Sequence, residues 1–346
     1  MKAGRKSPVH KPKGRKYPPV SIIICARNEA ENLQNHLPLF LEQDYPDFEV
    51  ILVDDGSDDN TAEILDNLKV KFDNLRVSTI RKDSKFLRGK KLAMTIGLKA
   101  AKNEIVLLSD ADCYPSSKEW IKYMSRKFNK NKSIILGVGL YEKRKGLLNI
   151  LIRFESAFIA MQYISLTRIG KPYMGVGRNL SYRKELFFNN KGFASHLKLQ
   201  SGDDDLFINE VANAENSDIE TQPLSFTYSI PETKWIDWIR QKRRHLTTAK
   251  MYKKSSKRIL GLEYFSRMIL LLSFIFLLIT FEDKLSILIV YGFLLLIKGI
   301  TFYIAFKALH EKFLFLPSIV LEPLTPWFYG LLHIFNFFER KKTRWN

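Results

Sequence analysis

Buried strands and amphipathic helices alternate along the first third of the chain. Residues 20–26 are a continuous run of apolar, mostly β-branched residues of strand length, and leucines at helical spacing follow over 30–43. The same two patterns recur, predicting strands at 49–54, 75–80 and 104–109 and helices at 61–71 and 90–101. Strands that are unbroken apolar runs are typical of a parallel sheet covered by helices on both faces. We therefore predict an α/β domain with a mostly parallel sheet.

Polar residues follow three of these strands at their carboxyl ends. They are Arg27-Asn28-Glu29 after the first strand, Asp54-Asp55-Gly56-Ser57 after the second, and Asp110-Ala111-Asp112 after the fourth. Ligands of such sheets bind beyond the carboxyl ends of the strands. Asp, Asn, Ser and Gly there also serve as turn and helix-capping residues, which explains 57–61 well. Two carboxylates directly after a buried strand repel each other unless a cation or a proton lies between them, so a metal role is favoured for Asp110 and Asp112.

The sequence lacks the patterns of several common sites. Cys25 and Cys113 are the only cysteines, too few for a disulfide framework and without the spacing of a structural zinc site. No GxGxxG follows a predicted strand, and Gly89-Lys90-Lys91 lacks the flanking residues of a P-loop. A hydrophobic content of 46% excludes a disordered chain. We expect a reduced, cytosolic catalytic part without a dinucleotide or kinase-type site.

Apolar residues are concentrated in the last quarter of the chain. A bilayer core needs about 20 apolar residues per helix, so 285–306, with Lys298 as its only charge, predicts a membrane span. A second span is predicted over 263–281, with Arg267 snorkelling to the interface. The stretch 313–338 is long enough but is interrupted by three prolines and a glutamate. It predicts either a kinked span or a re-entrant segment.

Charged flanks predict the orientation of this membrane region, residues 263–346. The segment 240–258 holds nine Lys/Arg and no acidic residue, whereas the loop 282–284 is net acidic. The positive-inside rule then predicts a multi-pass protein of the inner membrane with its catalytic domain in the cytoplasm. The basic tail 339–346 also favours the cytosol, which three full spans would forbid, so the re-entrant interpretation is preferred.

Three further segments are expected to lie near the membrane. Residues 1–17 form a basic flank without the apolar core of a signal peptide; the flank is either a solvated arm or attracted to anionic lipids, and a preceding span stays open. Residues 233–262 predict an interfacial amphipathic helix, because apolar residues recur there at three- and four-residue spacing between Lys and Arg. The apolar stretch 147–164 carries Arg153 and Glu155, which favours a membrane-surface helix or a core helix over a span.

Six motifs occur in a specific order along the chain. They are VSIIICARNEAENL, ILVDDGSDDNT, GKKLAMTIGLKAAKNEIVLLSDAD, GVGRNLSYRKELF, SGDDDLF and QKRRH. Together they resemble the inverting family 2 glycosyltransferases of the membrane-anchored bacterial type, over roughly residues 18–262. The resemblance implies a Rossmann-like GT-A catalytic domain over 18–232, followed by the interfacial helix and the transmembrane helices.

The resemblance implies contacts to a nucleotide-sugar donor from several of these motifs. The expected donor-binding residues are Ala26, Arg27, Asn28, Glu29, Asp54, Asp55, Lys90, Lys91, Asp110, Ala111, Gln241 and Arg244. A departing nucleoside diphosphate needs a hard cation, and an Asp-x-Asp tip supplies oxygen ligands for Mg²⁺ or Mn²⁺. Asp112 is the expected first ligand, and Asp110 contacts the metal or the ribose. Either lysine could instead belong to a solvated helix start.

An inverting displacement also needs a carboxylate that removes the proton of the acceptor hydroxyl. The resemblance puts this base in the run Asp203-Asp204-Asp205, at Asp204 when the run is aligned on Leu206. Repulsion among three neighbouring carboxylates should raise the pKa of at least one. The run also suits the N-terminus of a helix, where anionic side chains are favoured. Gly177 and Asn179 are expected on the acceptor side.

His245 departs from the family's Q-x-x-R-W motif, in which a Trp occupies that position. In processive synthases the Trp helps to hold the terminal sugar of the growing chain, so its absence favours transfer of one sugar to a lipid-linked acceptor. Lys242, Arg243 and Arg244 could also form a solvated or lipid-facing basic face, and we prefer this interpretation for Lys242.

We therefore predict a membrane-bound, metal-dependent glycosyltransferase that uses a UDP-sugar and a lipid-linked or envelope glycan acceptor. A processive polysaccharide synthase is the alternative within the same class. A catalytically silent scaffold is a further alternative, because of His245. A nucleic-acid-binding protein is suggested by the net charge of +19. The basic residues, however, cluster in the N-terminal arm and beside the predicted spans, so no nucleic-acid partner is expected.

Overall fold

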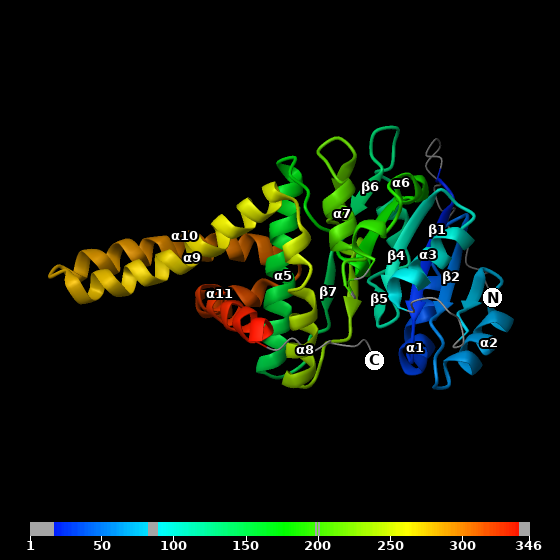
Figure 1. Cartoon of the computed structure of the whole chain (residues 1–346), viewed down its shortest axis with the longest axis horizontal. Helices are drawn as coiled ribbons and strands as arrows, with labels where there is room; N and C mark the ends of the chain where they lie inside the picture. The colour runs from blue at the N-terminus through cyan, green and yellow to red at the C-terminus, as the bar shows by residue number, and fades with distance from the viewer. Residues whose placement is uncertain (1–16, 82–88, 198, 200, 339–346) are drawn as a thin grey trace, which may run out of the picture.

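The structure is a computed structural model, and it describes residues 17–81, 89–197, 199 and 201–338. An α/β domain carries a helical extension, from which two long helices project as a hairpin (Figure 1). The predicted basic flank, apart from Tyr17, and the basic tail 339–346 lie outside the described residues.

A seven-stranded sheet forms the centre of the α/β domain, in the order β3-β2-β1-β4-β8-β6-β9. The strands β1 (Val20–Ala26), β2 (Phe48–Asp54), β3 (Leu75–Thr79) and β4 (Ile105–Asp110) are parallel neighbours. The strand β8 (Leu180–Arg183) runs antiparallel to β4 and to β6 (Ile134–Leu136), and β9 (Ser217–Ile219) is parallel to β6. The predicted Rossmann-like, mostly parallel sheet is confirmed.

Helices cover both faces of this sheet. Successive residues of a strand point to opposite faces, so Ile23 packs with α3 (Lys90–Ala100), whereas Ile22 and Ile24 pack with α1 (Ala30–Leu41) and α2 (Thr61–Lys71). All three isoleucines are at most 1% exposed. Because β1 is buried on both faces, apolar and polar residues do not alternate along it.

A small second sheet follows the carboxyl end of β4, in the order β5-β10-β7. The strand β10 (Thr227–Ser229) is antiparallel to β5 (Cys113–Pro115) and parallel to β7 (Gly139–Tyr141). Since β5 begins directly after Asp112, its pairing fixes the backbone that leaves the Asp-x-Asp motif. Two short helices complete the domain, α6 (Lys184–Asn189) and α7 (Asp205–Val211).

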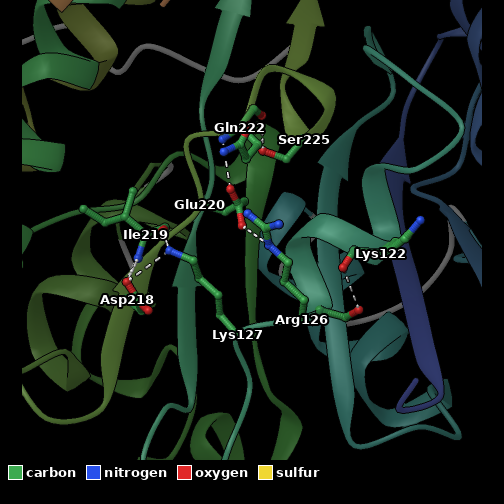
Figure 2. A network of polar contacts seen from close by, with 9 residues as sticks. Lys122, Arg126, Lys127, Asp218, Ile219, Glu220, Gln222 and Ser225 are labelled. Atoms are coloured by element: carbon green, nitrogen blue, oxygen red, sulfur yellow. Dashed lines mark hydrogen bonds and ion pairs between the residues drawn. The ribbon is translucent and has the colours of Figure 1, made fainter. Parts of the chain in front are cut away.

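Charged residues that follow α4 (Trp120–Ser125) hold the edge strand β9 (Figure 2). Arg126 Nε donates to Glu220 Oε2 at 2.8 Å, and Lys127 Nζ donates to the carbonyl of Ile219. Glu220 is 1% exposed and also accepts a bond from the Gln222 N–H at 2.9 Å. A buried carboxylate is tolerated only with such partners, so this cluster stabilises the end of the sheet.

The helix α5 (Leu147–Arg168) lies between the sheet and the helical extension (Figure 1). Its charges are paired inside the protein, Arg153 with Glu311 and Glu155 with Lys242. More than half of its apolar segment is buried in the protein. Of the two alternatives for 147–164, the core helix therefore describes it, and the prediction of a solvated or lipid-facing Lys242 is wrong.

The single interfacial helix predicted over 233–262 is wrong in its extent. The structure has α8 (Trp235–His245), a 3-10 turn (Ala249–Met251) and then the start of α9 at Lys254. The break has a physical reason, because Thr248 and Tyr252 both donate a side-chain hydrogen bond to Asp205 Oδ2, at 2.6 and 2.8 Å. These bonds hold the segment between the helices against α7.

The hairpin consists of α9 (Lys254–Thr280) and α10 (Lys284–Ala308), which stack Phe274 on Tyr291 with ring centroids 3.8 Å apart. Both helices are long and apolar enough to cross a membrane, as is α5. Unlike α5, they bury almost none of their apolar surface in the protein. The two predicted spans, 263–281 and 285–306, thus fall on candidate membrane helices.

The preferred re-entrant interpretation of 313–338 is wrong, because residues Phe315–Phe338 form one helix, α11. Pro326 has no N–H, which leaves the carbonyl of Glu322 without its helical donor. Arg267 Nη1 and Thr325 Oγ1 donate to that carbonyl instead, at 3.3 and 3.1 Å. Bonds from neighbouring side chains therefore allow the helix to continue through Pro326.

Two charges of the predicted spans are directed at α11. Arg267 does not snorkel; it pairs with Glu263 at 2.7 Å and lies 4.8 Å from the ring centre of Phe158. Lys298 Nζ pairs with both carboxylate oxygens of Glu322, at 3.0 and 3.1 Å. Polar contacts within the helical extension thus link α11 to both helices of the hairpin.

Candidate active site

The carboxyl ends of β1, β2 and β4 meet at one edge of the sheet. In the register of the sheet, Ala26 is opposite Asp54 and Cys25 is opposite Asp110. The backbone N–H of Asp55 donates to the carbonyl of Ala26 at 2.8 Å. The polar segments that follow the three strands therefore lie side by side.

Asn28 joins the loop after β1 to the loop after β2. Its φ of 56° is left-handed, a conformation that Asn adopts more readily than most residues. Its N–H donates to Ser57 Oγ at 2.9 Å, and its Oδ1 accepts from the Asp58 N–H at 2.8 Å. Asp54 is buried and accepts from both the N–H and the hydroxyl of Ser57. One oxygen of Asp54 thus serves the turn, as the capping interpretation predicts, while Asp55 is buried beside it.

Glu29 lies close to the acidic pair at the end of β4. Burial raises its pKa to about 7, and the charges of Asp112 and Asp110 add to the shift, against a hydrogen bond from Asn32. Arg27 is half-buried in the same loop. Ala26 and Ala111 are almost completely buried, so they offer the site mainly backbone.

Asp110 and Asp112 bring ligand atoms within 4.8 Å of each other and of Cys113 Sγ. Burial raises the pKa of the Cys113 thiol well above its usual value, and the thiol donates to Asp112 Oδ1 at 3.3 Å. The sulfur is therefore protonated and no thiolate ligand is offered. Burial, followed by the charge of Asp110, raises the pKa of Asp112 to about 6. A pair of carboxylates without a thiolate fits a hard divalent cation.

Lys90 connects the acidic pair to the acidic trio. Its Nζ lies 2.8 Å from Asp110 Oδ1 and 2.9 Å from Asp203 Oδ2. Gly89, just before α3, has a φ of 137°, which side-chain-bearing residues rarely adopt, and so sets the direction of the helix start. Burial acts to lower the pKa of Lys90, but Asp110 and Asp203 outweigh it and keep the pKa well above its usual value. Lys90 is therefore a permanent cation between the two groups.

Asp204 is the N-cap of α7 and faces the acceptor-side glycine. Its Oδ1 accepts from the Asp205 N–H at 2.7 Å, and its Oδ2 accepts from the Gly177 N–H at 2.6 Å. Burial raises the pKa of Asp204 to about 7, and the charges of Asp203 and Asp205 add to the shift. The helix-cap interpretation of Asp204 is thus confirmed, and its role as the base stays a prediction.

The other members of the trio have different surroundings. Burial acts to raise the pKa of Asp203, but Lys90 outweighs it and the pKa lies below its usual value. Burial raises the pKa of Asp205, whose carboxylate accepts from Thr248 and Tyr252. Asp203 therefore serves as an ion-pair partner and Asp205 as an anchor for the segment after α8.

Two of the residues named from the sequence do not join these groups. Lys91 Nζ donates to the carbonyls of His196 and Leu199, at 2.6 and 2.9 Å, so its ammonium group is bound by a loop and does not pair with the acidic groups. Asn179 is fully buried and all its polar atoms are used, with its amide donating to Val138 and Ser225 and its oxygen accepting from Trp120. Both side chains are structural here, because backbone carbonyls and a buried indole N–H needed partners.

The QxxR segment lies on α8, which an apolar cluster and an ion pair fix to α5 and α11. Trp238 stacks on Phe328 with ring centroids 5.3 Å apart, and Lys242 pairs with Glu155. Gln241 is half-buried. Arg244 Nε is buried without a hydrogen-bond partner among the described residues. The Nε–H group of Arg244 can therefore still donate a hydrogen bond to an anionic ligand.

The sequence analysis did not single out Arg178, which the structure puts beside the acidic pair. Its guanidinium lies 4.4 Å from the ring centre of Tyr141. In the sequence, Arg178 is marked only by its position between two motif residues, Gly177 and Asn179. Arginines are common in turns, and the burial of this one depends on tertiary contacts that the sequence does not reveal. Glu155, which holds Lys242, was likewise named only as a charge in an apolar helix.

The mostly parallel seven-stranded sheet with its helical layers is a GT-A fold. A similar fold is seen in the mannosyltransferase PcManGT from Pyrobaculum calidifontis, solved with GDP-Man and Mn²⁺, with a TM-score of 0.58 and 17% identity over 94% of this chain and 89% of that one. Residues 21–188 match the family model Glycosyl transferase family 2. Over these residues, just under half of the chain, the protein is similar to glycosyl transferase family 2.

Curated relatives share the α/β domain only in part. Poly-beta-1,6-N-acetyl-D-glucosamine synthase of Staphylococcus epidermidis is 36% identical over 115 residues, 33% of this chain and 26% of that protein. Glycosyltransferase AglE of Haloferax volcanii is 36% identical over 107 residues, 30% of this chain and 34% of that protein. The match thus spans about a quarter to a third of the length of these relatives.

Proposed function

We propose that this protein is a membrane-bound inverting glycosyltransferase. In this proposal it transfers a sugar from a nucleotide sugar, a UDP-sugar in our expectation, to a hydroxyl of a lipid-linked or envelope glycan, with Mg²⁺ or Mn²⁺. One observation carries the proposal: Lys90 joins the acidic pair of the metal-type motif to the acidic trio that holds the candidate base. Donor departure and acceptor deprotonation need these two groups within the length of one sugar.

The side chains divide the reaction between them. A divalent cation held by Asp112 and Asp110 would stabilise the negative charge of the departing diphosphate. Lys90 and Arg244 offer further positive charge to the diphosphate, and the loops of Asp54 and Asp55 receive the nucleoside. Asp204 accepts the proton of the acceptor hydroxyl while the Gly177 N–H holds its Oδ2 in place. The sugar is then attacked from the face opposite the leaving group, which inverts the anomeric centre.

A panel assay tests the proposal directly. The detergent-solubilised protein is supplied with UDP- and GDP-sugars, Mn²⁺ or Mg²⁺ and a membrane lipid extract, and nucleotide release is followed. We expect release with at least one donor, lost with a chelator and restored by the added metal. Equal turnover with all divalent ions removed would contradict the metal role, and no release with any donor would contradict the activity.

A processive polysaccharide synthase is the second candidate, supported by the similarity to the staphylococcal synthase. The two candidates differ in the length of the product. Mass spectrometry of the labelled product distinguishes addition of one sugar, which we expect, from a ladder of increasing length. A ladder from the wild-type protein would favour the synthase despite His245.

A further inference from the structure

Arg178 carries a buried nitrogen that the chain does not use. Nη1 has no hydrogen-bond partner among the described residues, and Nη2 reaches Ser156 Oγ only at 3.5 Å. The guanidinium plane lies against Tyr141. A buried, charged N–H without an acceptor is costly. Such a group is typical of a site that an anionic ligand completes.

Backbone contacts put Arg178 close to the acidic pair and to the candidate base. The carbonyl of Arg178 accepts from Ser109 Oγ at 3.1 Å, one residue before the acidic pair begins. The preceding N–H, of Gly177, binds the candidate base Asp204. The positive charge of Arg178 acts on both Asp110 and Asp112 and opposes the burial that raises the pKa of Asp112. Arg178 therefore lies between the metal-type carboxylates and the acceptor side.

Three other half-buried cations of the domain already have carboxylate partners. Lys90 has two, Arg126 has Glu220, and Arg153 has Glu311. Within the described ranges Arg178 forms no ion pair shorter than 4.0 Å, although acidic residues are near. The guanidinium is thus held by Tyr141 and Ser156 with one buried donor unused, as in a rigid receptor for oxygen anions.

We propose that Arg178 Nη1 binds a phosphate oxygen of a substrate beside the cation held by Asp112 and Asp110. This inference rests on the proposed function and names a ligand of that same site. The phosphate has two possible sources, the diphosphate of the donor nucleotide and the phosphate of a lipid-linked acceptor. Tyr141 also belongs to an apolar cluster with Ile152 and Trp238, which would suit the lipid source. The bond formed is the same in both cases.

The test compares Arg178→Met and Arg178→Lys with Arg183→Met in the full chain. Arg183 lies at the far end of β8, opposite Ile105, and its guanidinium covers Phe128 at 5.8 Å, so it is a matched control. Titration calorimetry in one detergent measures three probes: Mn²⁺ alone, pyrophosphate with Mn²⁺, and farnesyl phosphate. Thermal unfolding checks that each variant is folded, and Arg178→Lys keeps the charge without the fork.

We expect the methionine variant to lose about 10- to 100-fold in affinity for one phosphate probe, as for a charge-assisted bond. Loss for pyrophosphate assigns the donor, and loss for farnesyl phosphate assigns the acceptor. Unchanged affinity for both probes, or an equal loss in Arg183→Met, overturns the inference. So does tighter Mn²⁺ binding with unchanged phosphate affinities, the result expected of a residue that only balances the acidic pair. A wild-type protein that binds neither probe would contradict the proposed function itself.

Discussion

The three neighbouring aspartates show how surroundings give one residue type three uses. Lys90 keeps Asp203 ionised, hydroxyl groups of Thr248 and Tyr252 bind Asp205, and only a backbone N–H binds the far oxygen of Asp204. The trio titrates as a group, so its apparent pKa values belong to the set. Burial raises the pKa of Asp204 to about 7, which suits a base that must accept a proton and release it again.

Asp204→Asn should remove transfer and leave donor binding intact. An amide keeps the shape and can still accept the Gly177 N–H, but it cannot take the acceptor proton. We expect kcat to fall by about 10²- to 10⁴-fold, with an unchanged dissociation constant for the donor nucleotide. The control is Asp66→Asn on the exposed surface of α2. Full transfer by the Asp204 variant would reassign the base to a neighbouring aspartate.

The raised pKa of Asp204 sets the direction of the pH dependence. The base is active when ionised, so activity should rise from pH 5 to pH 8 with an apparent pKa near the value of about 7. Below that pH the carboxyl carries a proton and cannot accept another. The measurement is kcat against pH at saturating donor and metal. In Asp204→Asn the residual activity should lose this rise; a rise of the same size in the variant would assign it to another group.

Asp112→Ala should abolish metal-assisted departure. Asp110, which also pairs with Lys90, is then the one carboxylate of the acidic pair left to hold the cation. We expect turnover to fall by about 10³-fold or more, since a metal contributes several kcal/mol to such a step. Mn²⁺ titration of the variant should show weakened binding. Wild-type affinity for Mn²⁺ in the variant would contradict the assignment.

Among the elements, α5 connects the catalytic sheet to the helical extension through buried charges. Glu155 accepts a bond from Tyr329 of α11 and pairs with Lys242 of α8, so three helices meet at one carboxylate. Since α8 also carries Gln241 and Arg244, this contact sets how the QxxR segment faces the sheet edge. The position of the QxxR segment thus depends on a helix that was predicted from its apolar composition alone.

A double-mutant cycle tests the pair of Lys242 and Glu155. Each single variant, Lys242→Met or Glu155→Gln, leaves a buried charge without its partner and should cost about 3–5 kcal/mol. The double variant should be more stable than the sum of the two losses implies. The measurement is chemical unfolding in detergent, with Lys69→Met as an exposed control. Additive losses would mean that the pair contributes no coupling.

Regular elements were predictable where one local pattern decides them. β1 and α2 have the predicted bounds, because an apolar run and a helical spacing are complete within a few residues. The break after α8 depends on Asp205, more than 40 residues away, and the partner of Lys242 is in α5. No local pattern contains such partners.

The site was predictable to the same degree. Residues at strand ends were brought together because parallel strands share an edge. The side chain of Lys91 is bound by two carbonyls of a later loop. The side chain of Asn179 is bound by Trp120 and two more carbonyls. A backbone carbonyl has no signature in a sequence, so neighbouring residues such as Lys90 and Lys91 could not be told apart.

At the scale of the whole molecule, the apolar hairpin of α9 and α10 is the part that is suited to insertion into a membrane (Figure 1). Its surface is exposed along both helices, while the α/β domain buries its own apolar residues in two cores. We propose that the hairpin crosses the inner membrane with the catalytic domain on the cytoplasmic side, in line with the basic segment before α9.

Cysteine labelling tests this topology. A membrane-impermeant maleimide on intact cells should modify Asp283→Cys, in the turn of the hairpin, and should modify Lys130→Cys in the catalytic domain only after permeabilisation. The native Cys25 and Cys113 give little background, because burial raises the pKa of both thiols. The reverse pattern would place the catalytic domain outside.

The pairing of Lys298 with Glu322 has a consequence for biogenesis. If α10 spans the bilayer, it leaves the ribosome with an amine near its midpoint whose carboxylate is synthesised 24 residues later. A lysine at the centre of a spanning helix adds about 2.5–3.5 kcal/mol to the free energy of insertion, and this cost is recovered only once α11 has docked. In nascent chains truncated before Glu322, a smaller fraction should therefore have α10 inserted in the bilayer than in longer chains. The variant Lys298→Leu should remove that difference.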